Sequence, residues 1–71
     1  MRDVIINREP VELFKILKFE SLVGSGGEAK QVIEEGLVLV NNEVENRKRR
    51  KIVSGDVIEF NQEQLKVILG S

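Results

Sequence analysis

Hydrophobic residues recur at spacings of three and four in two stretches of the chain, which is the pattern of an amphipathic helix. In the first stretch, Leu13, Ile16 and Leu17 form an apolar stripe. Pro10 precedes this stripe, and proline suits the first position of a helix because its ring fixes a helical φ. We therefore predict a first helix that begins at Pro10 and ends near Phe19 or Ser21.

The second stretch follows a glycine-rich segment and carries helix signals at both ends. Ser25 stands three residues before Glu28, the spacing of a capping box, in which the serine side chain accepts a hydrogen bond from a backbone N–H of the first turn. An apolar stripe begins at Ala29, and Gly36 follows it, in the place where glycine commonly ends a helix. We predict a second short helix between Ser25 and Gly36.

Short runs rich in β-branched and other apolar residues predict strands before and after the helices. They occupy residues 3–7, 37–40, 43–45, 57–60 and 65–69. Polar and apolar residues alternate in the third run, as in a half-exposed strand, and turn-forming pairs such as Asn41-Asn42 separate the later runs. The order predicts an α+β fold in which two short helices pack on a small, mostly antiparallel sheet. The sequence leaves open whether the first and last strands pair.

The length and composition of the chain indicate one ordered domain. Its 71 residues suffice for a single small core, and 41% hydrophobic with 32% charged residues is typical of a globular protein rather than a disordered tail. The chain has no cysteine, no apolar run near the ~20 residues of a membrane helix, and no signal-peptide pattern at its start. We therefore expect a cytoplasmic protein that works as a monomer.

The net charge of −1 hides a strong local concentration of positive charge. Five of the 11 basic residues are consecutive, whereas the acidic residues are spread along the chain. Because charges are screened over roughly 8–10 Å at physiological salt, the local field matters more than the average. A phosphate backbone requires clustered cations, so we predict RNA contacts by Arg47, Lys48, Arg49, Arg50 and Lys51.

The arrangement of these five side chains depends on the backbone. In an extended segment Arg47, Arg49 and Lys51 would share one face, whereas a loop could turn more of the five toward one side. The competing structural interpretation is an edge segment kept basic to prevent strand pairing. Five successive cations repel one another, and acidic residues would serve equally well at an edge, so we favour RNA contact.

A second candidate contact is the glycine-rich start of the second helix. Free N–H groups and the positive end of a helix favour phosphate, which predicts contacts by Ser25, Gly26 and Gly27. The segment lacks the Gly-Lys-Ser/Thr of a nucleotide-binding P-loop. The alternative is a flexible turn with a serine cap, in which Glu28 occupies the positive end of the helix itself.

Three lysines on the predicted helices would extend the basic surface, although exposed helix lysines are also common without any ligand. They are Lys15, Lys18 and Lys30. Asn41 could bond ribose or phosphate, and a plain turn role explains it at least as well. We include all four residues among the predicted RNA contacts.

Base stacking finds little support in the sequence. The chain has no Trp and no Tyr, and its three phenylalanines, Phe14, Phe19 and Phe60, lie in apolar patterns that predict core positions. Recognition should therefore rest on the RNA backbone and its shape, as for duplex or junction RNA, rather than on splayed single strands.

Catalysis is not expected. The chain has no His and no Cys, so the commonest general base, the thiolate nucleophile and the usual transition-metal ligands are absent. Glu34 and Glu35 are adjacent, but neighbouring helix positions point about 100° apart and do not share a site. We therefore expect neither enzymatic activity nor a metal or other cofactor.

An ordered set of motifs between Val11 and Phe60 resembles the S4 RNA-binding domain. The length and the basic run are similar to those of small stand-alone bacterial S4-like proteins. The resemblance implies an S4, or αL-like, fold with two short helices before a β-hairpin. It also implies binding to folded ribosomal or transfer RNA through the helical pair, the hairpin and the adjoining loop. The matching motifs are Ser-Gly-Gly-Glu-Ala-Lys at 25–30, Glu-Glu-Gly-Leu-Val at 34–38, Val-Asn-Asn-Glu-Val at 40–44, the basic run with Ile52, and Gly-Asp-Val at 55–57.

Two departures from the S4 pattern concern the candidate site. Many S4 domains carry Arg where this chain has Gly26, which weakens the family's phosphate contact at that position. The hairpin turn is often Asn-Gly, and here it is Asn41-Asn42, a mild change because Asn also tolerates a positive φ.

Two other functions stay open at this point. Residues 38–60 resemble part of a β-grasp sulfur carrier, but such carriers need a C-terminal Gly-Gly, and this sequence ends in Gly70-Ser71. The stronger alternative is a protein-interaction adaptor whose basic run docks an acidic partner, because carboxylates attract the same cations as phosphates.

Overall fold

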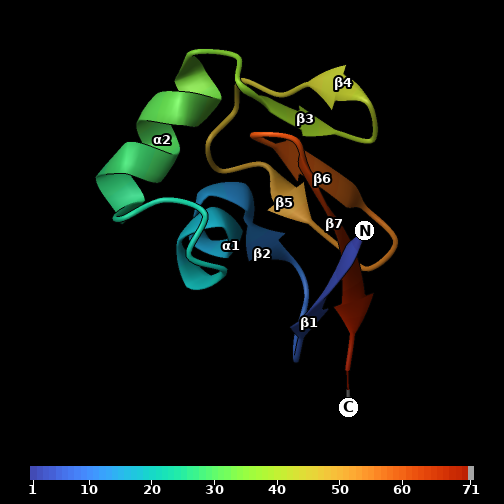
Figure 1. Cartoon of the computed structure of the whole chain (residues 1–71). Helices are drawn as coiled ribbons and strands as arrows, with labels where there is room; N and C mark the ends of the chain where they lie inside the picture. The colour runs from blue at the N-terminus through green and yellow to red at the C-terminus, as the bar shows by residue number, and fades with distance from the viewer. Residues whose placement is uncertain (71) are drawn as a thin grey trace.

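The computed structural model describes residues 1–70 and consists of two short helices beside a β-sheet (Figure 1). The prediction of an α+β fold, with two short helices on a mostly antiparallel sheet, is confirmed. The helices are α1 (Leu13–Phe19) and α2 (Gly26–Glu34), which pack against each other. The strands are β1 (Arg2–Ile6), β2 (Val11–Glu12), β3 (Val38–Val40), β4 (Glu43–Val44), β5 (Lys51–Ile52), β6 (Val57–Phe60) and β7 (Glu63–Leu69).

The main sheet has five strands in the order β1-β7-β6-β3-β4. Its pairs are antiparallel except β1 with β7, which run parallel with Val4 beside Val67. The first and last strands of the chain therefore do pair. Two-residue turns join β3 to β4 and β6 to β7, and tight hairpin turns of this kind need positive φ angles. The residues with positive φ in these turns are Asn41, Asn42, Asn61 and Gln62.

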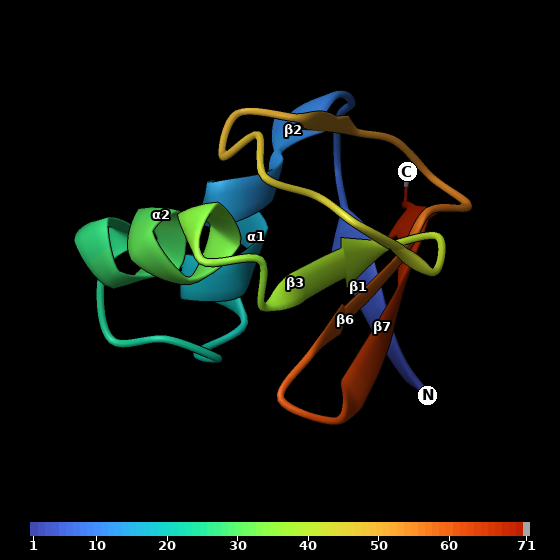
Figure 2. The ribbon, with the colours of Figure 1, turned by 90° about the horizontal axis from the view of Figure 1, so that it is seen from above.

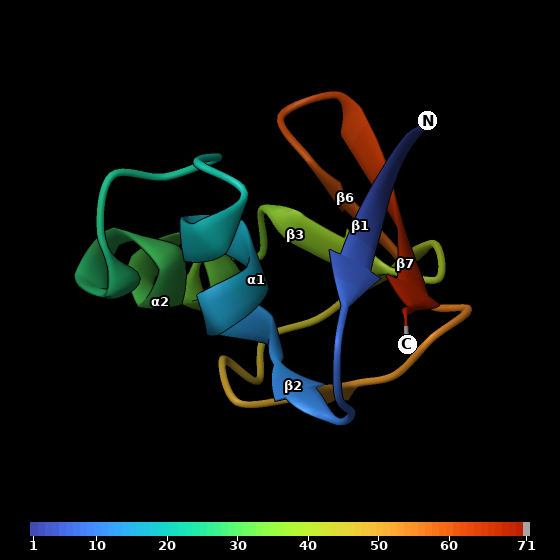
Figure 3. The ribbon, with the colours of Figure 1, turned by 90° about the horizontal axis from the view of Figure 1, so that it is seen from below.

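Helix α1 begins at Leu13, and the prediction that it begins at Pro10 is wrong. Residues Val11–Glu12 instead form β2, which pairs antiparallel with β5 and leads directly into α1 (Figure 3). The pairing joins segments that are far apart in the sequence, so it leaves no mark on the local hydrophobic pattern. Proline here precedes a strand, which is compatible with its missing N–H.

Helix α2 begins and ends as predicted. The Ser25 side chain caps its start by accepting a hydrogen bond of 3.1 Å from the N–H of Glu28. Gly36 follows its end with a φ of +79°, a left-handed conformation that glycine adopts without strain. Neither this helix nor any other in residues 1–70 is long and apolar enough to cross a membrane.

The core lies between the helical pair and the sheet (Figure 2). The predicted stripe of α1 is confirmed, since Leu13, Ile16 and Leu17 are at most 2% exposed. Ile52 of β5 is fully buried as well, so the small β2–β5 pair closes the core next to α1. The remaining buried apolar residues are Val4, Ile6, Val23, Ala29, Ile33, Val38, Val40, Ile58, Leu65 and Val67.

The three phenylalanines, all predicted as core residues, differ in their burial. Phe14 and Phe60 are half-buried and pack against the edge of the core. Phe19 is 67% exposed, so its prediction as a core residue is wrong. It is the last residue of α1, where the chain turns away and leaves the ring uncovered.

Candidate nucleic-acid interface

The consecutive basic residues form a turn that leads into β5, here called the basic turn (residues 47–51). The N–H of Arg50 donates to the carbonyl of Arg47 at 3.2 Å, which closes the turn. The extended backbone considered for this run is therefore wrong, and the segment forms a loop instead. A turn directs neighbouring side chains in several directions, so their positions depend on what each one contacts.

Backbone hydrogen bonds attach the basic turn to the start of α1. The N–H of Leu13 donates to the carbonyl of Arg50 at 2.9 Å, and the N–H of Phe14 donates to the carbonyl of Lys48 at 3.1 Å. The first amides of a helix have no partner within the helix. These two bonds therefore satisfy the start of α1 and fix the basic turn against it.

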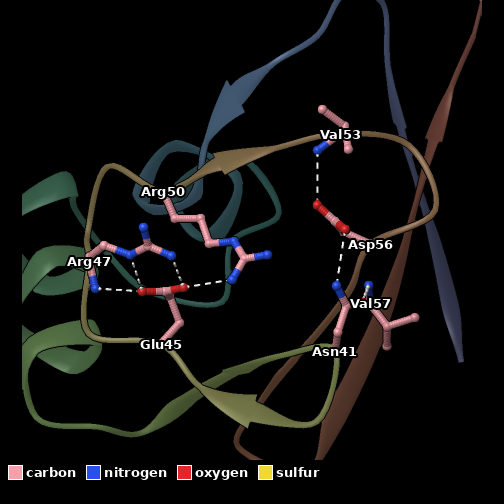
Figure 4. A network of polar contacts seen from close by, with 7 residues as sticks. All are labelled: Asn41, Glu45, Arg47, Arg50, Val53, Asp56 and Val57. Carbon is pink, nitrogen blue, oxygen red and sulfur yellow. Dashed lines mark hydrogen bonds and ion pairs between the residues drawn. The ribbon is translucent and has the colours of Figure 1, made fainter.

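The carboxylate of Glu45 holds two side chains of the basic turn, those of Arg47 and Arg50 (Figure 4). Glu45 is 6% exposed. It accepts hydrogen bonds from the backbone N–H, Nε and Nη2 of Arg47 at 3.0, 2.9 and 3.1 Å, and from Nη1 of Arg50 at 2.8 Å. In the half-exposed strand predicted for residues 43–45, Glu45 should be exposed and Val44 buried; this is wrong for both, since Val44 is 56% exposed. Strand β4 ends at Val44, after which the carboxylate turns inward toward the arginines.

These contacts lower the pKa of Glu45 to about 2. The hydrogen bonds from the Arg47 side chain are the largest cause, and with those from Arg50 they outweigh burial, which acts in the opposite direction. The same contact raises the pKa of Arg47. Glu45 is therefore ionised near neutral pH, and because two guanidinium groups share one carboxylate, the group as a whole keeps a positive charge.

Three cations from three elements surround the ring of Phe14, and we call these four residues the Phe14 cluster. Lys30 of α2 has its Nζ 4.7 Å from the ring centroid. Arg49 of the basic turn lies at 5.7 Å and Lys15 of α1 at 5.9 Å. Within about 6 Å a cation is attracted to the face of an aromatic ring. The cluster thus brings together predicted contact residues from both helices and the basic turn.

Glu12 partly neutralises the Phe14 cluster. Its carboxylate lies 3.2 Å from Nζ of Lys15 and 3.4 Å from Nη1 of Arg49. The hydrogen bond from Lys15 is the largest cause of the lowered pKa of Glu12. Ion pairs at a protein surface contribute little to stability because solvent screens them, so a phosphate can displace the carboxylate from either cation at little cost.

A shallow hollow beside the basic turn is lined by cationic residues alone. An arginine presents a planar fork of donors that matches the oxygens of a phosphate, and a hydrogen bond between two ionised groups is stronger than one between neutral groups. Because Glu45 holds Arg47 and Arg50, these two side chains are already ordered before a ligand arrives. The lining consists of Arg47, Arg49, Arg50 and Lys51.

The start of α2 is capped by the chain itself. Besides the Ser25 cap, the N–H of Gly24 donates to Oε1 of Glu28 at 2.6 Å. Glu28 therefore lies at the positive end of the helix, as the alternative interpretation of this segment expected. RNA contacts by Ser25, Gly26 and Gly27 stay predictions, and a phosphate at this end would compete with the Glu28 carboxylate.

Gly26 faces the ring of Phe14. A Cβ at Gly26 would lie 3.9 Å from the ring, which is an ordinary van der Waals contact. This is the position at which many S4 domains carry Arg. It is therefore adjacent to the Phe14 cluster and has room for a side chain.

Two of the predicted lysines, Lys48 of the basic turn and Lys18 of α1, do not belong to the Phe14 cluster. Lys48 points to α2, where its Nζ lies 2.8 Å from Oε2 of Glu34. Lys18 is exposed on α1 and lines a groove between α1 and β1. Both remain accessible to a ligand that covers the helical pair.

Asn41 lies apart from these cations, at the turn between β3 and β4 (Figure 4). Its Nδ2 donates to Oδ1 of Asp56 at 3.1 Å, and its Oδ1 accepts from the N–H of Val57 at 2.9 Å. Asp56 in turn accepts from the N–H of Val53 at 3.0 Å. Asn41 thus has a structural role in joining two turns, and RNA contact by it stays an untested prediction.

Reasoning from sequence missed the two residues that organise this surface, Glu45 and Phe14. The available signals were weak: Glu45 stands two residues before the basic run, and Phe14 stands next to Lys15. Only the folded chain shows that one carboxylate is buried and that one ring collects three cations. Within residues 1–70, no group of acidic side chains is placed to hold a metal ion.

Proteins of known sequence resemble this chain over most of its length. YbcJ of Escherichia coli (strain K12), named as an RNA-binding protein, is 45% identical over 58 residues, which cover 82% of this chain and 83% of YbcJ. RlbA of Bacillus subtilis (strain 168), named as a ribosome maturation protein, is 43% identical over 57 residues, which cover 80% of each chain. These two names refer to RNA and to the ribosome.

The fold is also similar to a solved structure. The solution structure of E. coli YbcJ, described as containing an αL motif involved in RNA binding, matches with a TM-score of 0.72 at 39% identity, covering 96% of this chain and 87% of that one. The family model of the S4 domain matches residues 4–68, which include both helices, the hairpin and the basic turn. The expected αL-like fold is confirmed, and the chain belongs to the S4 domain family.

Proposed function

We propose that this chain binds structured RNA of the ribosomal or transfer RNA class through the basic turn and the Phe14 cluster, without catalysing a reaction. The single observation that carries this proposal is the hollow lined by four cations, Arg47, Arg49, Arg50 and Lys51. It adjoins the Phe14 cluster because Arg49 belongs to both. Together they form a continuous basic surface on a chain whose net charge is −1.

The geometry supports a phosphate ligand more than an acidic protein surface. A structured RNA presents a dense line of phosphates, which suits cations that approach one another from three separate elements. Membership in the S4 domain family supports the same choice. The relative RlbA is named as a ribosome maturation protein, which favours ribosomal RNA as the ligand. Such RNA is cytoplasmic in bacteria, so we place the function there.

The residues have different roles in this proposal. Arg49 and Lys51 bind phosphate directly, because no buried carboxylate holds them. Arg47 and Arg50 share their donors between Glu45 and the RNA, and they keep the hollow in shape. Lys15, Lys18, Lys30 and Lys48 extend the contact over the helical pair, and the start of α2, at Ser25, Gly26 and Gly27, lies at its border.

The proposal includes no cofactor and no chemical step. The hollow contains guanidinium and ammonium groups alone, and such groups are positively charged donors that bind anions rather than abstract protons. The protein acts as a monomer that recognises the shape and the backbone of a duplex or junction, as the groove geometry of A-form RNA favours.

The test is an equilibrium binding measurement with a ribosomal RNA hairpin on three forms of the protein. The first is the wild type, and the second is the Arg49→Gln/Lys51→Gln variant, which spares the contacts of Glu45. The third, Arg2→Gln/Lys66→Gln, removes the same number of positive charges outside the basic surface. Because all three forms keep the buried residues, far-ultraviolet circular dichroism should show the same fold.

We expect the Arg49→Gln/Lys51→Gln variant to bind about tenfold or more weakly than the wild type at 0.1 M salt, and the Arg2→Gln/Lys66→Gln variant to lose only a small part of the affinity. Equal losses in the two variants would mean that net charge alone drives binding. Unchanged affinity in the first variant would remove the basic turn from the interface.

A further inference from the structure

A groove of about 690 Å³ runs between α1 and β1, next to the proposed RNA surface. Its apolar lining includes Ile5, Ile6, Pro10 and Phe19. Two of these side chains are unusually open to solvent, since Ile5 is 64% and Phe19 67% exposed. A volume of this size is in the range of pockets that take small flat ligands.

Cations line the same groove. They are Arg8, Lys15 and Lys18. Within residues 1–70, neither Arg8 nor Lys18 forms an ion pair. Two carboxylates also line the groove, and both are engaged by the chain.

The two carboxylates are those of Glu12 and Glu20. Glu12 lies 3.2 Å from Nζ of Lys15, and Glu20 lies 3.5 Å from Nη2 of Arg2. The unpaired charge of the groove is therefore positive. A ligand that fits must combine a flat apolar body with negative charge at its edge.

We propose that the groove holds an unpaired nucleotide of the bound RNA, with its base against Phe19 and its phosphates beside Lys18 and Arg8. This inference rests on the proposed function and names the RNA more narrowly, as a duplex with a single-nucleotide bulge or an unpaired end. Bases within an A-form duplex have both faces covered by their neighbours. An unpaired base has a free face that can stack on an aromatic ring.

The groove is continuous with the proposed interface, which places both on one RNA. Phe14, Lys15 and Gly26 line the groove, and the first two also belong to the Phe14 cluster. A duplex whose phosphates lie on the basic turn can therefore place an adjoining unpaired nucleotide in the groove. An apolar peptide is the competing occupant, but it would leave Arg8 and Lys18 without an anion.

The test compares two RNA hairpins that differ only in one bulged nucleotide. Binding of each is measured for the wild type, for Phe19→Ala, and for Leu69→Ala as a control. Leu69 is also an exposed apolar residue, at 45%, and it is not part of the groove. Because Phe19 is largely exposed, its replacement should leave the fold intact.

We expect the wild type and Leu69→Ala to bind the bulged hairpin about fivefold or more tightly than the regular one, and Phe19→Ala to lose this preference, because a base stacked on an aromatic side chain adds that much affinity. The aromatic spectrum gives a second readout, since the protein has three Phe and no Trp or Tyr. Ring-proton resonances of Phe19 should shift upfield with the bulged hairpin and stay in place with the regular one.

The outcomes separate this inference from the proposed function. If the wild type binds both hairpins equally well, or if Phe19→Ala keeps the preference for the bulge, the groove does not hold the nucleotide, while the proposed RNA binding stands. If neither hairpin binds, the proposed function fails and the inference fails with it.

Discussion

Arg50 donates a hydrogen bond of 2.8 Å from its Nη1 to Oε1 of Glu45, and so joins the end of the β3–β4 hairpin to the basic turn. The carbonyl of the same Arg50 accepts from the N–H of Leu13 at the start of α1. One residue thus connects the hairpin, the turn and the helix. Glu45 is the counterpart that keeps this arrangement in place, because its buried carboxylate also binds Arg47.

We expect Glu45→Gln to lower the free energy of unfolding by about 1–3 kcal/mol at pH 7, because the variant loses charged hydrogen bonds at a buried position. The loss stays moderate because Arg47 is largely exposed and can turn to solvent. Urea unfolding of the wild type and the variant measures the difference. Glu43→Gln, at an exposed position of the same hairpin, is the control and should change stability by less than about 0.5 kcal/mol.

The contribution of Glu45 should depend on pH in a defined direction. Its pKa of about 2 in the folded protein lies below the ordinary 4.5, so the carboxylate stabilises the fold fully above about pH 4.5 and loses this effect as the pH falls toward 2. The stability gap between the wild type and Glu45→Gln should therefore be constant near neutral pH and shrink in acid. A gap that stays the same down to about pH 2.5 would contradict the assigned role.

Phe14→Leu tests whether the ring organises the surrounding cations. Leucine keeps an apolar contact with the edge of the core but removes the attraction of Lys15, Lys30 and Arg49 to the ring face, worth about 0.5–1 kcal/mol each at an exposed site. We expect a small loss of stability and a loss of RNA affinity of about fivefold. Phe60→Leu, at another half-buried phenylalanine, is the matched control and should leave the affinity unchanged.

Gly26→Arg should strengthen RNA binding. A side chain at this position meets only the Phe14 ring, at 3.9 Å from its Cβ, and an additional guanidinium beside the Phe14 cluster can reach a phosphate. We expect a gain of about two- to tenfold in affinity, as for one charged hydrogen bond. Gly26→Gln adds a side chain of similar reach without charge, so equal gains in both variants would attribute the effect to helix stability instead.

Local patterns predicted most of the elements because their causes are local. The stripe that begins at Leu13, the Ser25 cap and the positive φ of Gly36 each depend on residues within one or two turns. Strand β2 could not be found in this way, because Val11–Glu12 becomes a strand only by pairing with Lys51–Ile52. The same pairing moves the start of α1 beyond Pro10.

The candidate site was predicted from the concentration of positive charge in the sequence, and the structure then showed what each of these side chains contacts. The basic run indicated the candidate interface, since five consecutive cations can be recognised from the sequence alone. The sequence does not show which of these cations bind Glu45, which one joins the Phe14 cluster and which one pairs with Glu34. These contacts depend on the neighbours that the fold supplies. The exposure of Phe19 could not be predicted either, because the helical pattern does not show where the chain leaves the core.

The dependence of RNA affinity on salt tests the central claim most directly. If four or five phosphates are neutralised, the logarithm of the association constant should fall with the logarithm of the salt concentration at a slope of roughly −3 to −4, and the Arg49→Gln/Lys51→Gln variant should have a slope shallower by roughly 1.5 to 2. A slope near zero, or the same slope for the two proteins, would contradict binding of RNA phosphates by the basic turn.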